Sequence, residues 1–222
     1  MLDEISAIRN LVLIPLVAPY FVIVYFILYL VGSIPFAYIL TKFSGFGDIR
    51  NIGSGNTGAT NVLRTGNKFL AFLVLILDVA KGFVPIFLIK YNYLKISGFE
   101  IVNNLAFSNF LGILIILGHI FPIWLKFKGG KGVATYIGVL FAVDVTIGFY
   151  FIIFWLIIAF IFKYSSLSSI ISCLLIPLLF FYFSEEDLLN TIIIFLMSLI
   201  VILKHYSNIL RLLNKSENKI RF

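Results

Sequence analysis

Residues 131–162 read KGVATYIGVLFAVDVTIGFYFIIFWLIIAFIF, and they decide how many times the chain crosses a membrane. A membrane-spanning helix needs about 20 mainly apolar residues. The stretch is therefore either one long span or two rather short spans that meet at Asp144. The two interpretations place every later residue on opposite sides of the membrane, so the topology of the C-terminal part depends on this segment.

Composition places the whole chain in a membrane. Of its 222 residues, 61% are hydrophobic and 12% are charged, whereas soluble domains carry about 25% charged residues. Pro15 and Pro19 interrupt the first apolar run, so we predict an interfacial N-terminal extension over residues 1–18 and a single domain over residues 19–222. The predicted spans are 19–41, 69–90, 103–124, 131–144, 146–162, 167–183 and 187–206.

Positive charge favours seven spans, because Lys and Arg accumulate in cytoplasmic loops. Seven spans place thirteen Lys and Arg residues on one side and three on the other, with Lys81 inside a span. Joining residues 131–162 into one span gives a near-even seven against nine. We therefore predict an all-α membrane protein with seven transmembrane helices, its N-terminus outside and its C-terminus in the cytoplasm.

The segment GSGNTGATNVLR, residues 53–64, is a polar, glycine-rich loop in an otherwise apolar chain. Glycines let backbone N–H groups turn toward one point, and neighbouring hydroxyl, amide and guanidinium groups add donors, as enclosing a phosphate requires. By pattern alone, a tight turn at the membrane surface explains the glycines equally well. The donors in the loop are on Ser54, Asn56, Thr57, Thr60, Asn61 and Arg64.

A second basic turn lies in GHIFPIWLKFKGGKGVAT, residues 118–135. Lys131 is bracketed by glycines and is the better candidate ligand, whereas Lys126 and Lys128 fit anchors to anionic lipid. The segment lacks the GxxxxGK[ST] spacing of a P-loop, which excludes that mode of nucleotide binding.

The later spans carry further polar groups. His205, Asn208 and Arg211 follow one another at three-residue spacing, which places them on one face of the last helix. Asp78 and Lys81 have the same spacing within the second span, and we predict an intramembrane ion pair that braces it.

Serines follow the fifth span, and a lone cysteine lies in the sixth. We interpret Ser165 and Ser166 as helix caps and Ser169 as a side chain that points into the bundle and can contact a ligand. Cys173 is the only cysteine, so neither a disulfide nor a cysteine-based metal site is expected.

Five segments together, in this order, resemble the bacterial acyl-phosphate-dependent glycerol-3-phosphate acyltransferases. The resemblance covers about residues 20–220. The segments are GSIPFAYIL (32–40), GSGNTGATNVLR (53–64), LDVAKGFVP (77–85), GHIFPIWLKFKGGKGVAT (118–135) and HYSNILRLL (205–213).

This resemblance implies a seven-span enzyme of the inner cell membrane with its active site facing the cytoplasm. Such enzymes transfer a fatty acyl group from acyl phosphate to the 1-hydroxyl of sn-glycerol 3-phosphate, giving lysophosphatidic acid and inorganic phosphate. This is the first acylation step of bacterial phospholipid synthesis. The expected partners are these two substrates and membrane lipid, without a cofactor, a metal or nucleic acid. The resemblance implies catalytic roles for Ser54, Arg64, Lys131, His205 and Asn208, and substrate-binding roles for Gly53, Gly55, Asn56, Thr60, Gly130 and Ser169.

Two alternatives stay open at the level of sequence. The acceptor proton can pass to His205 or to a phosphate oxygen of the substrate itself. The same cations and glycines also suit a membrane transporter for an organic phosphate, although no internal repeat supports that class. The HxxxxD pairing of other acyltransferases is absent, since Trp124 and Leu210 stand where its aspartate would follow His119 and His205.

Overall fold

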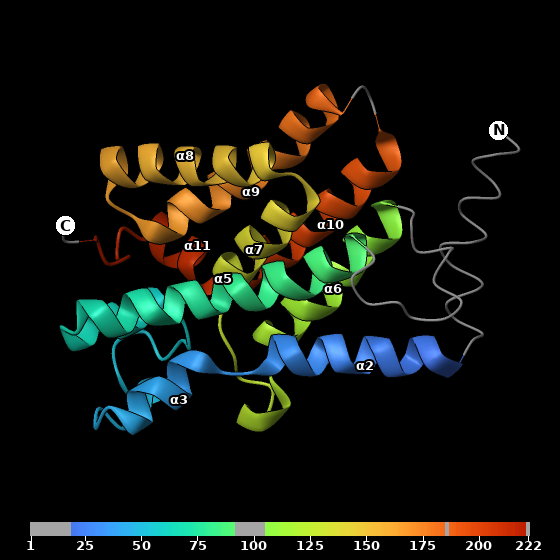
Figure 1. Ribbon diagram of the computed structural model, residues 1–222. Coiled ribbons are helices and arrows are strands. Elements are labelled where there is room, and N and C mark those ends of the chain that lie inside the picture. The colour runs from blue at the N-terminus through green and yellow to red at the C-terminus, as the bar shows by residue number, and fades with distance from the viewer. Residues whose placement is uncertain (1–18, 92–104, 185–186, 221–222) are drawn as a thin grey trace, which may run out of the picture.

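A computed structural model describes residues 19–91, 105–184 and 187–220 of the chain (Figure 1). Within these ranges the regular secondary structure is entirely helical. The predicted extension, residues 1–18, lies outside the described residues. The α-helices are α2 (Pro19–Ser33), α3 (Phe36–Phe43), α4 (Ala59–Val62), α5 (Lys68–Lys90), α6 (Leu105–Ile120), α7 (Val133–Val143), α8 (Val145–Phe162), α9 (Ser165–Phe183), α10 (Leu188–Lys204) and α11 (Tyr206–Leu213), and the short 3₁₀ helices are η1 (Ile49–Asn51), η2 (Leu63–Thr65) and η4 (Ile123–Leu125).

The described helices are those of a membrane protein. Two pairs, α2 with α3 and α10 with α11, are bent by 41° and 59°, and each pair passes as one span if counted together. With these pairs the structure has up to six helices long and apolar enough to cross a membrane, while α7 is apolar but has only 11 residues. The four segments that pass singly are Lys68–Lys90, Ala106–Leu125 (α6 continued through η4), Val145–Phe162 and Ser165–Phe183.

The chain breaks at Asp144, so residues 131–162 form two helices. Asp144 has an extended backbone with φ −154° and ψ 121°, which ends α7. Its carboxylate accepts a hydrogen bond of 3.0 Å from the backbone N–H of Ile147 and thereby caps the first turn of α8. A residue that stops one helix and starts the next explains why a single continuous span does not form.

Glycines allow neighbouring helices to pack backbone against backbone. A Cβ atom at Gly82 of α5 would overlap the carbonyl oxygen of Thr135 in α7, and one at Gly138 of α7 would overlap that of Val79. The α2–α6 crossing is equally close, since a Cβ at Gly32 would overlap the carbonyl of Ile115. Close approach through small residues is the usual means of helix association in lipid, where no hydrophobic driving force acts between helices.

Four segments gather at one end of the bundle, namely the loops after α3 and α6, the α8–α9 turn and the C-terminal segment. Figure 1 shows α11 beside the beginning of α9, with the C-terminal segment at the same end as the beginning of α5. The backbone N–H of Ile220 donates a hydrogen bond of 2.7 Å to the carbonyl of Lys163. The first and second loops also touch, because a Cβ at Gly130 would lie 3.0 Å from the carbonyl oxygen of Thr57.

Candidate active site

The first loop is built around the side chain of Asn61. Its amide nitrogen donates to three carbonyl oxygens of the loop, at 3.1 Å from Ile49, 2.9 Å from Ile52 and 3.0 Å from Asn56. Its oxygen accepts the backbone N–H of Ser54 at 2.9 Å. Asn61 is buried, and its side chain is used up in holding the loop together. It is therefore not free to donate to an anion, although the sequence had suggested that it would be.

Two glycines permit the tight turn of this loop. Gly53 and Gly55 have φ angles of +55° and +72°, which residues with a side chain rarely adopt. A Cβ at Gly53 would also lie only 2.5 Å from Asn61 Oδ1 and 2.6 Å from Arg64 Cδ. The turn leaves Gly53, Ser54 and Gly55 exposed, with Ser54 accepting a hydrogen bond of 3.1 Å from Asn56 Nδ2.

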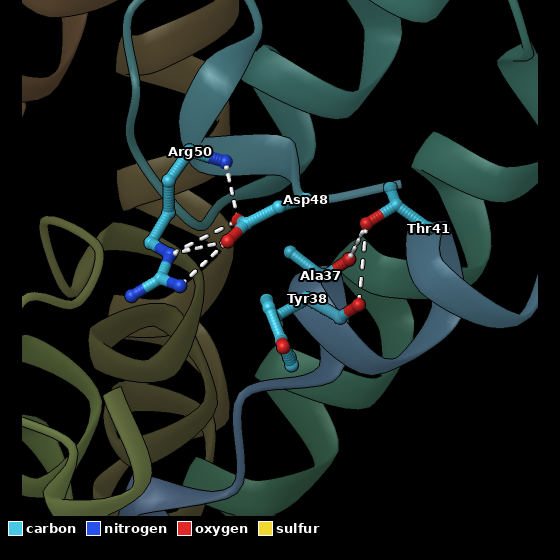
Figure 2. A network of polar contacts seen from close by, with 5 residues as sticks. All are labelled: Ala37, Tyr38, Thr41, Asp48 and Arg50. Atoms are coloured by element: carbon cyan, nitrogen blue, oxygen red, sulfur yellow. Dashed lines mark hydrogen bonds and ion pairs between the residues drawn. The ribbon is translucent and has the colours of Figure 1, made fainter. Parts of the chain in front are cut away.

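The two arginines of the loop differ in what their charges contact. Figure 2 shows Arg50 held by the carboxylate of Asp48, with Nε–Oδ1 at 2.9 Å, and its guanidinium also lies 5.3 Å from the ring of Tyr38. The hydrogen bonds from Arg50 lower the pKa of Asp48. The Arg64 side chain is exposed and makes no hydrogen bond or ion pair with any residue that the structure describes. Arg64, unlike Arg50, therefore has a guanidinium available to a ligand. Thr60, in the same loop, is also exposed.

The second loop fits tightly between the first loop and α6. The N–H of Gly130 donates to the carbonyl of His119 at 3.2 Å. A Cβ at Gly130 would overlap His119 Nε2, so only glycine leaves room for this ring. His119 Nδ1 in turn lies 3.6 Å from Asp78 Oδ1. The position of Lys131, the next residue along, therefore depends on a buried group within the membrane.

That buried group contains the predicted ion pair. Lys81 Nζ lies 2.7 Å from Asp78 Oδ1, and both side chains are 2% exposed, which confirms the pairing expected from the three-residue spacing. Lys81 also donates to the carbonyl of Ile34 at 2.9 Å, at the break between α2 and α3. The pair thus links three elements as well as bracing α5.

Lys131 is half-buried and carries an unpaired charge. Its ammonium makes no hydrogen bond or ion pair within residues 19–91, 105–184 and 187–220, whereas Lys126 and Lys128 are exposed. Burial lowers the pKa of Lys131 to about 8; the charge of Glu217 opposes this shift, and those of Arg211 and Arg64 add to it. The charges that act on Lys131 belong to the first loop and to the C-terminal part of the chain.

His205 lies just after α10 and is buried. Its Nδ1 is 2.8 Å from the carbonyl of Val201, and because a carbonyl can only accept, Nδ1 carries the proton and Nε2 has the free lone pair. Burial and the charge of Lys131 lower the pKa of His205 to about 4, although the hydrogen bond to Val201 and the charge of Glu217 oppose the shift. The ring is therefore neutral at pH 7.

A carboxylate that the sequence did not single out lies beside these cations. Glu217 Oε1 accepts hydrogen bonds from Ser166 Oγ at 2.7 Å and Asn208 Nδ2 at 2.6 Å, and Oε2 accepts one from Arg211 Nε at 2.7 Å. Burial alone raises the pKa of Glu217, but the hydrogen bonds from Ser166, Arg211 and Asn208 and the charge of Arg211 lower it overall. Glu217 lies in a short basic tail, where no helical spacing links it to Ser166 or Asn208.

The serines of α9 differ from expectation. The N-cap of α9 is Tyr164, without a side-chain cap hydrogen bond, so the prediction that Ser165 and Ser166 cap this helix is wrong. Ser166 instead faces Glu217. Ser169 is buried against α8, where its hydroxyl donates to the carbonyl of Ser165 at 2.9 Å and accepts from Trp155 Nε1 at 3.0 Å. Its ligand role stays a prediction.

A shallow apolar groove of about 300 Å³ adjoins the first loop. It lies at the break between α2 and α3 and is closed on the other side by η4. Tyr38 from this groove also packs against the small apolar cluster of Ile49 and Val62 that supports the loop. Its lining residues are Ile34, Pro35, Tyr38, Ile39, Trp124 and Leu125.

Comparison with known proteins identifies the family of the chain. The family described as Glycerol-3-phosphate acyltransferase matches residues 22–215. The chain belongs to this family. The family assignment confirms the resemblance seen in the five sequence segments and favours the enzyme over the transporter.

Relatives and solved structures extend the match over most of the chain. A glycerol-3-phosphate acyltransferase of Pelagibacter ubique is 45% identical over 193 residues, which cover 87% of this chain and 94% of the relative. One from Ehrlichia canis is 48% identical over 192 residues, 86% and 94% of the two chains. The crystal structure of PlsY (YgiH), an integral membrane glycerol 3-phosphate acyltransferase, in its glycerol 3-phosphate form has a TM-score of 0.80 and 34% identity, covering 90% of this chain and 95% of that one.

The same protein in its lysophosphatidic acid form has a TM-score of 0.78 and 32% identity, over 90% of this chain and 95% of that one. The chain is thus an integral membrane glycerol-3-phosphate acyltransferase.

Proposed function

We propose that this acyltransferase takes its fatty acyl group from acyl phosphate and attaches it to the 1-hydroxyl of sn-glycerol 3-phosphate, releasing lysophosphatidic acid and inorganic phosphate. The observation that carries the proposal is that the loops bearing Arg64 and Lys131 touch, since a Cβ at Gly130 would lie 3.0 Å from the carbonyl oxygen of Thr57, and that neither cation has a protein partner among the described residues. Both proposed substrates carry a phosphate, and cations with hydrogen-bond donors are what phosphates bind.

The reaction needs positioning and charge more than a covalent intermediate. The hydroxyl oxygen of the acceptor attacks the acyl carbonyl carbon, the bond from that carbon to the phosphate oxygen breaks, and the phosphate leaves with the electron pair. Lys131, Arg64 and the backbone N–H groups of the first loop stabilise the charge that develops on the departing phosphate. Ser54 and Thr60 contribute hydroxyl donors at the exposed rim of the loop.

The acceptor proton passes to a phosphate oxygen of the substrates. Burial and the charge of Lys131 lower the pKa of His205, which weakens its ring as a base. The phosphate oxygens are the other basic groups that the two substrates bring to the reacting hydroxyl. His205 then orients the acceptor through Nε2, the nitrogen that its hydrogen bond to Val201 leaves unprotonated.

The acyl chain lies along the apolar groove at the α2–α3 break. The groove adjoins the loop that would hold the phosphate end of the donor, and its wall contains only apolar and aromatic side chains such as Ile39 and Trp124. Replacing Ile39 by Trp narrows the groove and is expected to reduce turnover of a long-chain acyl phosphate more than that of a short-chain one.

The path of the chain supports seven crossings with the site on the cytoplasmic side. The loops after α3 and α6, the α8–α9 turn and the C-terminal segment meet at one end. Helix α7 therefore runs away from that end, and α8 returns to it. The short α7 then serves as a fourth crossing. Because Lys and Arg accumulate in cytoplasmic loops, the basic residues in these connections support a cytoplasmic location for this end, in an enzyme of the inner cell membrane.

The purified protein in detergent or lipid tests the proposal directly. Inorganic phosphate is expected to be released from palmitoyl phosphate only when glycerol 3-phosphate is present, with lysophosphatidic acid as the second product. A parallel reaction with palmitoyl coenzyme A tests the donor. Equal turnover with the coenzyme A donor, or no release with acyl phosphate, would reject the proposed donor.

A matched pair of lysine variants tests the site. Lys131→Ala is expected to lower turnover by about 100-fold or more, the usual effect of removing a group that stabilises developing charge. Lys126→Ala is the control, because Lys126 is exposed. Equal losses in both variants would show that Lys131 does not bind substrate.

A further inference from the structure

The C-terminal segment folds back over the end of α9. After α11 the chain turns at Lys215, which has a φ of +55°, and the N–H of Ser216 donates to the carbonyl of Arg211 at 2.8 Å. Three residues beyond Glu217, Ile220 is hydrogen-bonded to Lys163 in the α8–α9 turn. Glu217 is thereby held with its side chain 10% exposed, between α9 and α11.

The carboxylate decides which way the amide of Asn208 faces. An ionised carboxylate can only accept hydrogen bonds, so the Asn208 atom at 2.6 Å from Glu217 is the NH₂ group. The amide oxygen therefore points away from Glu217. Asn208 Oδ1 is buried and lacks a hydrogen-bond partner among the described residues, and a buried acceptor without a protein partner takes its donor from a ligand or a water molecule.

The free acceptor matches a hydroxyl of the acceptor substrate. The ionised phosphate of glycerol 3-phosphate only accepts, so the hydroxyl groups are that substrate's donors. Acyl phosphate has no hydroxyl besides those of its phosphate, and these are ionised near neutral pH. An oriented Asn208 therefore contacts the acceptor and not the donor.

We propose that Glu217 is a positioning residue for the acceptor substrate: its carboxylate holds Asn208 and Arg211 so that Asn208 Oδ1 is presented to a hydroxyl of glycerol 3-phosphate. The inference rests on the proposed function and adds to it a residue outside the loops that bind phosphate. Glu217 itself does not contact the substrate. Ser166 donates a hydrogen bond to the same carboxylate oxygen as Asn208 and helps to hold that oxygen in place.

The test compares three tail variants by steady-state kinetics, varying each substrate separately. Glu217→Ala frees the Asn208 amide to rotate, so KM for glycerol 3-phosphate is expected to rise about tenfold, equivalent to about 1.4 kcal/mol. KM for palmitoyl phosphate is expected to stay within about twofold. Glu217→Gln keeps an oxygen for Ser166 and Asn208 but loses the charge that pairs with Arg211. Its KM for glycerol 3-phosphate is expected to lie between those of the wild type and of Glu217→Ala.

Asn218→Ala is the matched control, because Asn218 is exposed and adjacent in the same segment. It is expected to leave both KM values unchanged. A rise of both KM values together in Glu217→Ala, or the same change in Asn218→Ala, would show that the segment only stabilises the fold and would overturn the proposal. If Glu217→Ala does not fold, an unchanged acceptor KM in Glu217→Gln overturns it as well. Phosphate release by the wild-type protein, with both substrates present, is measured in parallel. No release by the wild type would reject the proposed function, whereas the KM values of the variants test only the role of Glu217.

Discussion

Gly130→Ala should inactivate the enzyme without unfolding it, because the added methyl has no room. The new Cβ would overlap His119 Nε2 and lie 3.0 Å from the carbonyl oxygen of Thr57. His119 cannot retreat freely, since its other ring nitrogen faces Asp78 at 3.6 Å. The loop must then move by roughly 1 Å to restore ordinary contact distances, and Lys131 moves with it.

A displacement of about 1 Å at a catalytic group costs on the order of 100-fold in rate, and overpacking costs about 1–3 kcal/mol of stability. We therefore expect kcat/KM for phosphate release to fall about 100-fold, with a lower Tm in detergent. Gly58→Ala is the control, because a Cβ there meets nothing within 4 Å and its φ is −146°. If Gly130→Ala keeps kcat/KM within about threefold of wild type, the fit of His119 against this loop does not position Lys131.

Three further predictions follow from charges and from the topology. The value of kcat/KM should fall as pH rises through about 8, because Lys131 is charged below its pKa of about 8 and neutral above it. In Lys131→Arg any remaining activity should no longer fall at alkaline pH. An unchanged alkaline fall in this variant would assign it to another group. Asp78→Asn should destabilise the protein by about 3–5 kcal/mol, seen as a lower Tm, because it leaves the buried charge of Lys81 uncompensated. The double variant Asp78→Asn with Lys81→Met should recover part of this loss. No recovery would mean that the two residues are not coupled. A reporter fused after residue 222 should be active only in the cytoplasm, and activity on the outer side would refute the seven-crossing topology.

The sequence by itself determined the class of the protein and most of its helices. Hydropathy and charge act locally along the chain, so the long apolar stretches and the break at Asp144 could be located from residue order. The spacing of Asp78 and Lys81 likewise predicted an ion pair that the structure shows at 2.7 Å. The glycines and polar residues of the first loop were recognised as a group, although the role of Asn61 within it was not.

Only the tertiary structure decided which side chains meet. Glu217 lies in a short basic tail with no periodic pattern, yet it is hydrogen-bonded to Ser166, 51 positions earlier in the chain. From sequence, Ser166 was expected to cap α9 and Ser169 to contact a ligand, but the turn of α9 directs Ser166 toward Glu217 and Ser169 toward Trp155. Such contacts depend on how helices distant in sequence are packed and rotated, and neither hydropathy nor local spacing carries that information.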